Sequence, residues 1–335
     1  MQAKRRARDG RNHAFDRKSE RWRSSRGAAF KSLLTPTIKK AITLVIAFFM
    51  MRIYVIIKSM FYTIFAILVR ILSNSYLNVF QKLLTGLGQK SSVVNFYTYL
   101  GLGVIALLIM SLNSVIFSPE LLLNVFAMGA LGALGNYFII KALSIGELST
   151  LAPINSYKPV VALLAGIIYL QETPSLNALY GIFLIIAGTY FIFDRRNIEY
   201  NGKAVFYRVL ALICSGTEAV FIKKIILLTD VTTAFVYWVL AGLVFATLFV
   251  LPARKNLKIK SYKYQICLIL AVALMQYSTN FVFSRMNVSY ALALFQLSTL
   301  YSVFLGASIF HERNFRRKIL AALVMSAGAA SIILG

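Results

Sequence analysis

The sequence predicts an all-α polytopic membrane protein, a ten-helix bundle of two inverted five-helix repeats with a candidate extra helix at the N-terminus. Three observations predict this fold. Hydrophobic residues make up 59% of the 335 residues and charged ones 14%, against about 45–50% and about 25% in soluble domains. Apolar runs long enough to span a bilayer recur along the chain. The second half also repeats features of the first at a fixed offset.

The N-terminal 40 residues differ from the rest of the chain. They hold 13 of the 36 Lys and Arg residues, three acids and almost no aliphatic residues, so residues 1–40 are expected to form a disordered, basic cytoplasmic tail. A topology anchor explains this tail, and lipid or nucleic-acid binding is the alternative. No nucleic-acid partner is expected, because elsewhere the positive charge stands in short clusters between apolar segments, as lipid headgroups favour.

Residues 41–59 form the candidate extra helix. Their apolar run, 41–57, is broken only by Arg52 and lies at the short limit for a membrane span. It crosses the bilayer, lies in the interface, or is untranslated if the protein starts at Met51 or Met60. From residue 61 onward, apolar runs of about 20 residues alternate with short polar breaks, and continuous rather than alternating hydrophobicity excludes strands. We expect spans at 62–84, 93–116, 120–142, 147–170, 175–193, 204–227, 231–252, 263–284, 288–310 and 317–334.

The chain resembles itself when it is shifted by 140 residues. The matched pairs are Asn136-Tyr137 with Gln276-Tyr277, Ser149 with Ser289, Gly166 with Gly306, Glu172 with Glu312, and Ala187-Gly188 with Ala327-Gly328. The pattern predicts two five-helix repeats, at 61–195 and 203–335. Because five is odd, the second repeat must enter the membrane from the opposite side, which is the inverted-repeat plan of many secondary transporters.

Part of this repeated pattern carries a family resemblance. Its residues are Ala142-Leu143, Pro153, Pro159, Gly166, Glu172, Gly181 and Gly188 in the first repeat, with Gly306, Glu312 and Gly328 in the second. The pattern resembles the twice-repeated EamA module of the drug/metabolite transporter superfamily, over about residues 61–335. The resemblance implies ten-helix carriers that move small metabolites or drugs without ATP hydrolysis. It favours export, and we expect the plasma (inner) membrane as the location.

The loops indicate an orientation. Those after spans 5, 7 and 9 hold twelve Lys and Arg residues, whereas three lie near the loops on the other side. The positive-inside rule puts the twelve in the cytoplasm. EamA-like cores have both ends in the cytoplasm, and this chain departs from that. An extra span at 41–57 reconciles the two, which predicts eleven spans and an external C-terminus.

Charged side chains in the middle of a span indicate functional positions, because a charge there costs about 2.5–3.5 kcal/mol on insertion scales. Lys158 lies midway along the fourth span, before Pro159 and on the same face as Asn155. We interpret Lys158 as a cationic anchor for an anionic or zwitterionic small-molecule substrate. A structural pair with Glu218, midway along the sixth span, is the alternative. Glu218 could also bind and release a proton during transport, or form only a static salt bridge.

Uncharged polar side chains at membrane depth complete the predicted substrate site. Each can contact substrate or bond a neighbouring helix at about 1 kcal/mol. On the first span, Asn74 and Asn78 follow Arg70 at four-residue steps, which places all three on one helix face. The other candidates are Asn136 and Tyr137 on the third span, Gln276, Tyr277 and Asn280 on the eighth, and Gln296 and Tyr301 on the ninth.

The sequence favours transport over two other classes of function. Its only histidines, His13 and His311, lie in the tail and in a loop, and no hydrolase, metalloprotease or phosphate-binding motif is present. We therefore expect no enzyme, no catalytic residue, no cofactor and no metal site. A non-transporting membrane scaffold is the other alternative, against which the costly mid-span charges argue. The expected function is secondary transport by alternating access around a midplane site, with proton or ion coupling left open.

Overall fold

The computed structural model describes residues 57–170, 201–311 and 315–333, with single positions at 40, 51 and 54 and a few between 176 and 187. The predicted tail, most of the candidate helix 41–59 and most of the fifth predicted span lie outside the described residues, as do Glu172 and Glu312. The chain divides into two compact units, Met1–Tyr62 and Thr63–Gly335. The second unit carries the site described below.

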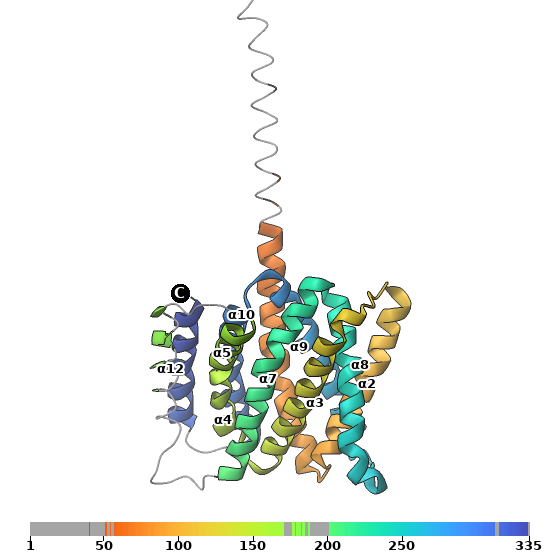
Figure 1. The fold of residues 1–335 in the computed structure, drawn as a ribbon. Coiled ribbons are helices and arrows are strands. Elements are labelled where there is room, and N and C mark those ends of the chain that lie inside the picture. The colour runs from red at the N-terminus through yellow and green to blue at the C-terminus, as the bar shows by residue number, and fades with distance from the viewer. Residues whose placement is uncertain are drawn as a thin grey trace, which may run out of the picture. The chain divides into compact units, whose positions relative to one another are not determined.

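Helices account for the secondary structure of the described residues. Eight helical segments are long and apolar enough to cross a membrane, and the first runs from Ile57 to Gly86. The elements that follow it (Figure 1) are α2 (Ser91–Leu112), η1 (Pro119–Leu121), α3 (Leu122–Ile145), α4 (Leu148–Leu151), η2 (Pro153–Tyr157), α5 (Lys158–Leu170), α7 (Gly202–Leu228), α8 (Val231–Val250), η3 (Leu251–Asn256), α9 (Tyr262–Arg285), α10 (Val288–Leu294), α11 (Leu297–Phe310) and α12 (Phe315–Ile333).

Polar residues in the breaks between apolar runs cap the starts of three helices. Asn201, Asp230 and Ser261 precede α7, α8 and α9, and each side chain accepts hydrogen bonds from backbone amides of the first turn. These are preferred N-cap residues because their oxygens satisfy amides that have no partner within the helix. The last predicted span corresponds to α12, which contains the apolar helical stretch Ile319–Gly328.

The element boundaries reproduce the internal repeat. The helices α3 and α9 have equal length, and their first residues, Leu122 and Tyr262, are separated by the offset of 140 found in the sequence. The same offset separates Leu148 from Val288, where α4 and α10 begin. The expected fold class is therefore confirmed as an all-helical membrane bundle of two repeats, which fit the inverted-repeat plan.

Two spans that the sequence predicts as continuous are interrupted at equivalent places. The fourth span consists of α4, η2 and α5, and the ninth consists of α10 and α11. In the fourth, the amide of Asn155 donates to Ala152 O rather than to Leu151 O. In the ninth, the amide of Gln296 donates to Ala293 O rather than to Leu292 O. Leu151 O and Leu292 O thus lose their helical donors, and inside a membrane each needs another donor.

Side chains supply both missing donors. Arg208 of α7 donates from Nε to Leu151 O at 3.1 Å. The Gln296 side chain donates from Nε2 to Leu292 O at 2.8 Å. Pro153, at the start of η2, explains part of the first break because it cannot donate a backbone hydrogen bond. Both carbonyls thus have hydrogen-bond partners within the protein.

The two repeats pack against each other through α3. This helix contacts α7 and α8 extensively, and Figure 1 shows it beside both. Close approach requires glycine at Gly129, where a Cβ would lie 2.3 Å from the Cβ of Ala241. The buried core along this interface includes Met128, Phe235 and Trp238. Residues of both repeats consequently meet at the inner faces of α3, α7 and α8.

Candidate functional site

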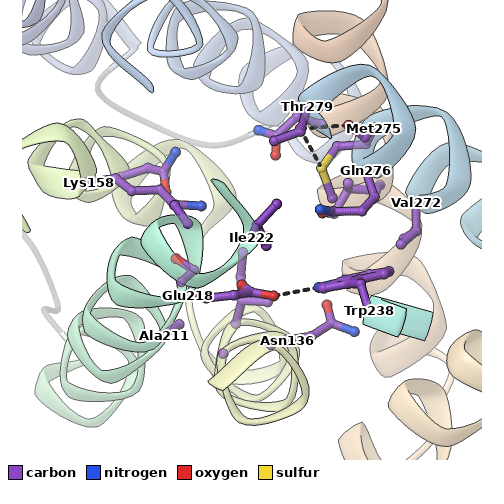
Figure 2. A pocket seen from close by; sticks show the side chains of 18 of the residues that line it. Asn136, Lys158, Ala211, Glu218, Ile222, Trp238, Val272, Met275, Gln276 and Thr279 are labelled. Atoms are coloured by element: carbon purple, nitrogen blue, oxygen red, sulfur yellow. Dashed lines mark hydrogen bonds between the residues drawn. The ribbon is translucent and has the colours of Figure 1, made fainter. Parts of the chain in front are cut away.

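A pocket of about 820 Å³, measured with its opening, lies between the two repeats. That figure includes open solvent at the mouth of the pocket, and the enclosed space itself is about 100 Å³. The first span, α3, η2 and α5 contribute from the first repeat, and α7, α8 and α9 from the second. Figure 2 shows part of the lining. The polar lining residues are Arg70, Asn74, Asn136, Asn155, Lys158, Arg208, Ser215, Glu218, Trp238, Gln276 and Thr279.

Lys158 lines this pocket at the point where the fourth span is broken. It is the first residue of α5 and follows directly on η2. The charges of Arg70, Arg208 and Glu218 all interact with that of Lys158, so the four ionisable groups form one cluster. Pro159 follows it in the first turn of α5, where a proline is tolerated.

Glu218 faces away from Lys158. It lies on α7, 8% exposed, and accepts a hydrogen bond from the indole Nε1 of Trp238 on α8. Figure 2 shows the carboxylate directed at Trp238. Lys158 and Glu218 share the pocket without the direct salt bridge that the sequence offers as the alternative. Space for the carboxylate comes from Gly132, where a Cβ would lie 2.4 Å from Oε1 of Glu218.

Arg70 is held in place by neighbours from the second repeat. Its Nε donates to Oγ1 of Thr279 at 2.6 Å, and its guanidinium lies 4.8 Å from the centroid of the Phe295 ring. The side chain is 5% exposed, and its Nη1 is buried with no hydrogen-bond partner. Because a buried donor without an acceptor is costly, this nitrogen calls for an explanation.

Arg208 contributes a second arginine from α7. It is 5% exposed and lines the pocket while its Nε caps Leu151 O at the break in the fourth span. One side chain thus links the broken helix to the second repeat and adds positive charge to the cluster. Within the described ranges, no group of three or more His, Cys, Asp or Glu side chains gathers.

The amide of Asn136 is already used between helices. Its Oδ1 accepts from Nε2 of Gln81 at 3.0 Å, and its Nδ2 donates to Oδ1 of Asn95 at 2.6 Å. Asn95 in turn donates to Ala133 O. The chain of amides connects the first span, α3 and α2. Asn136 lines the pocket, but these bonds favour the helix-bonding role that the sequence leaves open.

Asn74 and Gln276 line the pocket from facing elements, the first span and α9. Asn74 donates from Nδ2 to Oγ of Ser298 at 3.0 Å. The amides of Gln276 and Asn280 are 2.9 Å apart on successive turns of α9. Asn155 also belongs to the lining. The structure thus brings Lys158, Asn155, Asn136, Asn74, Gln276 and Glu218 together, as the sequence suggests.

The remaining candidates do not line the pocket. The three tyrosines contact side chains of other helices: Tyr137 the ring of Phe249, Tyr277 the hydroxyl of Thr232 at 3.3 Å, and Tyr301 the hydroxyl of Tyr76 at 3.1 Å. The three amides form hydrogen bonds within their own span: Asn78 with Asn74 O, Asn280 with the Gln276 side chain, and Gln296 with Leu292 O. The tyrosine contacts thus join neighbouring helices, whereas these amide bonds do not.

Several pocket residues are not identified by sequence reasoning. Arg208 lies four residues inside the predicted start of the sixth span, where a long side chain can reach the interface. Trp238 and Thr279 are ordinary residues of apolar helices. For Arg70 the sequence offers one indication of a pocket position, because it lies on the helix face that carries Asn74. The helix breaks could not be read from hydropathy, which stays high across them.

Comparison with known proteins agrees with this architecture. The family model of the EamA-like transporter family matches residues 60–194 and again residues 202–334. No curated protein sequence matches the chain significantly. A solved crystal structure is similar at a TM-score of 0.61 and 15% sequence identity, over 83% of this chain and 97% of that one. At this identity the likeness shows the fold alone. Because the family model matches most of the chain in two consecutive copies, the protein belongs to the EamA-like transporter family, whose members are multi-pass membrane transporters.

Proposed function

We propose that this protein is a secondary carrier for a small anionic or zwitterionic solute, which binds in the pocket between the repeats. The observation that carries the proposal is the composition of the pocket. Among the residues that the structure describes, Arg70, Lys158 and Arg208 line the pocket together with one carboxylate, that of Glu218. A water-filled substrate site explains such charges at membrane depth better than a packed interior does.

The helix breaks support the same reading. Inverted-repeat transporters bind substrate near discontinuous helices at equivalent places in their two halves. Here the fourth and ninth spans are interrupted at equivalent places, and Lys158 stands directly after the first break. Rocking of one repeat against the other would open the pocket to each side in turn. Export is the direction we propose, on the family resemblance alone.

The test is a solute screen with the purified protein in lipid vesicles. We expect the native protein to move at least one anionic or zwitterionic metabolite and the Lys158→Ala variant to lose most of that transport. Lys141→Ala is the matched control, because Lys141 lies on α3 against the rings of Tyr137 and Tyr207, outside the pocket lining. Size-exclusion chromatography checks that both variants remain folded.

Two outcomes would contradict the proposal at different levels. Equal transport by native and Lys158→Ala protein would remove Lys158 from the substrate site. A native protein that moves none of the solutes in the screen would favour the scaffold, the second class of function that the sequence leaves open.

A further inference from the structure

The ionisable residues of the pocket do not balance. Within the described part of the chain, three of them, Arg70, Lys158 and Arg208, are cations, and Glu218 is the one carboxylate in the lining. With all four ionised, the lining carries a formal charge of two positive units. Charge buried at membrane depth is costly unless a partner or ion compensates for it, so the occupied pocket needs two negative charges from elsewhere.

We propose that the solute carried in this pocket is a dianion, of the dicarboxylate or phosphate monoester type, bound between Arg70 and Lys158. This inference rests on the proposed transport function and narrows it to a substrate class. A dianion brings the charge sum of the four side chains and the solute to zero. A zwitterion or a monoanion leaves positive charge uncompensated.

Arg70 has the geometry of an oxyanion-binding group. Its Nε bond to Thr279 and its stacking on Phe295 hold the guanidinium plane in one position. Its Nη1 is buried without a partner. A preoriented guanidinium with a free donor matches the planar carboxylate or the phosphate group, which it binds through paired, charge-assisted hydrogen bonds.

Lys158 is the second anchor because it stands directly after the break in the fourth span and its charge belongs to the same cluster as that of Arg70. Arg208 uses its Nε to cap Leu151 O, and Glu218 accepts its hydrogen bond from Trp238. These two residues therefore set the electrostatic potential of the pocket. The Lys158 ammonium is a compact charge with three donors, able to follow the second anionic group of solutes that differ in length.

A binding experiment with simple anions tests this class before the physiological solute is known. The thermal unfolding of purified protein in detergent is followed with malonate, inorganic phosphate, acetate or chloride at equal ionic strength, at alkaline pH where phosphate is doubly ionised. We expect malonate or phosphate to raise the unfolding temperature in a saturable way, and acetate and chloride not to. Comparison of malonate with phosphate separates the two kinds of dianion.

Variants connect this effect to the two anchors. Arg70→Gln is expected to weaken dianion binding by about tenfold or more, the usual effect of losing a charge-assisted hydrogen bond, and Arg70→Lys by less. Arg285→Gln is the matched control, because Arg285 ends α9 on the ring of Phe281, outside the pocket. Where Arg70→Gln is not monodisperse, Lys158→Gln takes its place in the same titration.

The inference would be overturned if acetate or chloride stabilised the native protein as strongly as malonate and phosphate do. It would also be overturned if Arg70→Gln or Lys158→Gln bound dianions as well as the native protein does. Its failure is distinguishable from failure of the proposed function. Vesicles that move a monoanion or a zwitterion but no dianion would refute the substrate class and leave the carrier function standing.

Discussion

The Glu218 carboxylate is the residue whose role depends most on its neighbours. The indole N–H of Trp238 donates a hydrogen bond to one oxygen of the Glu218 carboxylate. That oxygen must accept, because an indole N–H can only donate. The charge of Lys158 acts on the same group from within the cluster without forming an ion pair. A carboxyl group in this setting can exchange a proton when the cations around it are neutralised by solute, which is the physical basis for the coupling hypothesis.

Replacement of Glu218 by Gln separates coupling from packing. The amide keeps an oxygen for Trp238 but cannot titrate. If Glu218 carries the coupling proton, a pH gradient will drive solute accumulation by native vesicles and not by Glu218→Gln vesicles, while exchange of labelled solute without a gradient continues. Gradient-driven accumulation that is unchanged in the variant would exclude Glu218 from coupling.

Gly132 offers a second test at the residue scale. A Cβ there would approach Oε1 of Glu218 to 2.4 Å and Nε1 of Trp238 to 3.0 Å. We expect Gly132→Ala to displace the carboxylate, to lower stability by about 1–3 kcal/mol through overpacking and to reduce transport. Thermal unfolding and vesicle uptake measure the two effects.

Gly135 provides the control on the same helix. Its added Cβ would make only ordinary contact, 3.4 Å from Cβ of Cys214. Gly135→Ala should therefore change stability by no more than about 0.5 kcal/mol. Equal effects of the two substitutions would mean that the Glu218–Trp238 contact is not what makes Gly132 necessary.

At the scale of elements, the start of α8 shows how a loop residue stabilises a transmembrane helix. Oδ1 of Asp230 accepts from the backbone amides of Thr232 at 2.7 Å and Thr233 at 3.0 Å. Partial burial alone would raise the pKa of Asp230. The hydrogen bonds from the hydroxyl of Thr233 and from the two backbone amides outweigh burial and lower this pKa below its ordinary value.

The lowered pKa predicts a pH dependence of stability. A carboxyl whose folded pKa lies below its unfolded pKa, about 3.9, stabilises the fold fully above that value. The contribution is lost as pH falls through the folded pKa. Asp230→Ala should therefore cost about 0.5–2 kcal/mol at neutral pH, and less in strong acid. Thermal unfolding across this pH range measures the difference.

Asp230→Asn is the matched variant, because asparagine is an equally good N-cap that does not titrate. We expect it to retain most of the neutral-pH stability and to lose the acid dependence that Asp230 contributes. A neutral-pH loss as large as that of Asp230→Ala would show that the negative charge, rather than the cap geometry, stabilises α8.

The two interrupted spans depend on side chains that replace missing backbone donors. Leu151 O and Leu292 O lose their helical donors and gain Arg208 and Gln296. A discontinuity inside a membrane persists only where side chains or water satisfy the freed groups. Because Arg208 also lines the pocket, the bond that secures the break places a charge at the proposed substrate site.

At the scale of the whole molecule, the distribution of basic residues predicts the orientation. We propose that the loops rich in Lys and Arg lie in the cytoplasm, that 41–57 is an additional span and that the C-terminus is external. A reporter that is active only in the cytoplasm, fused after Gly335, is expected to be inactive. The same reporter fused after Lys260, in the basic loop before α9, is the positive control.

An active reporter after Gly335 would contradict this prediction. It would mean either that the bundle has the opposite orientation or that residues 41–57 do not span the membrane. Fractionation of cells that express the fusion tests the plasma (inner) membrane as the proposed location. Neither result alters the internal arrangement of the two repeats, because inverted halves present related faces to both sides.

The sequence by itself determined the membrane-spanning helices, their approximate ends and the repeat of 140 residues. Hydropathy and spacing are properties of contiguous residues, so they survive without knowledge of the fold. The same reasoning identified Lys158 and Glu218, because a charge in an apolar run stands out wherever the helix packs.

Only the tertiary structure decided which polar residues meet. Tyr137 and Asn136 are neighbours in sequence, yet only Asn136 lines the pocket, because side chains of adjacent helical residues point about 100° apart and packing sets the rotation of each helix. The pairing of Glu218 with Trp238 and the entry of Arg208 from the other repeat depend on contacts between separate helices. Such contacts leave no mark on hydropathy, and they give the pocket its charge.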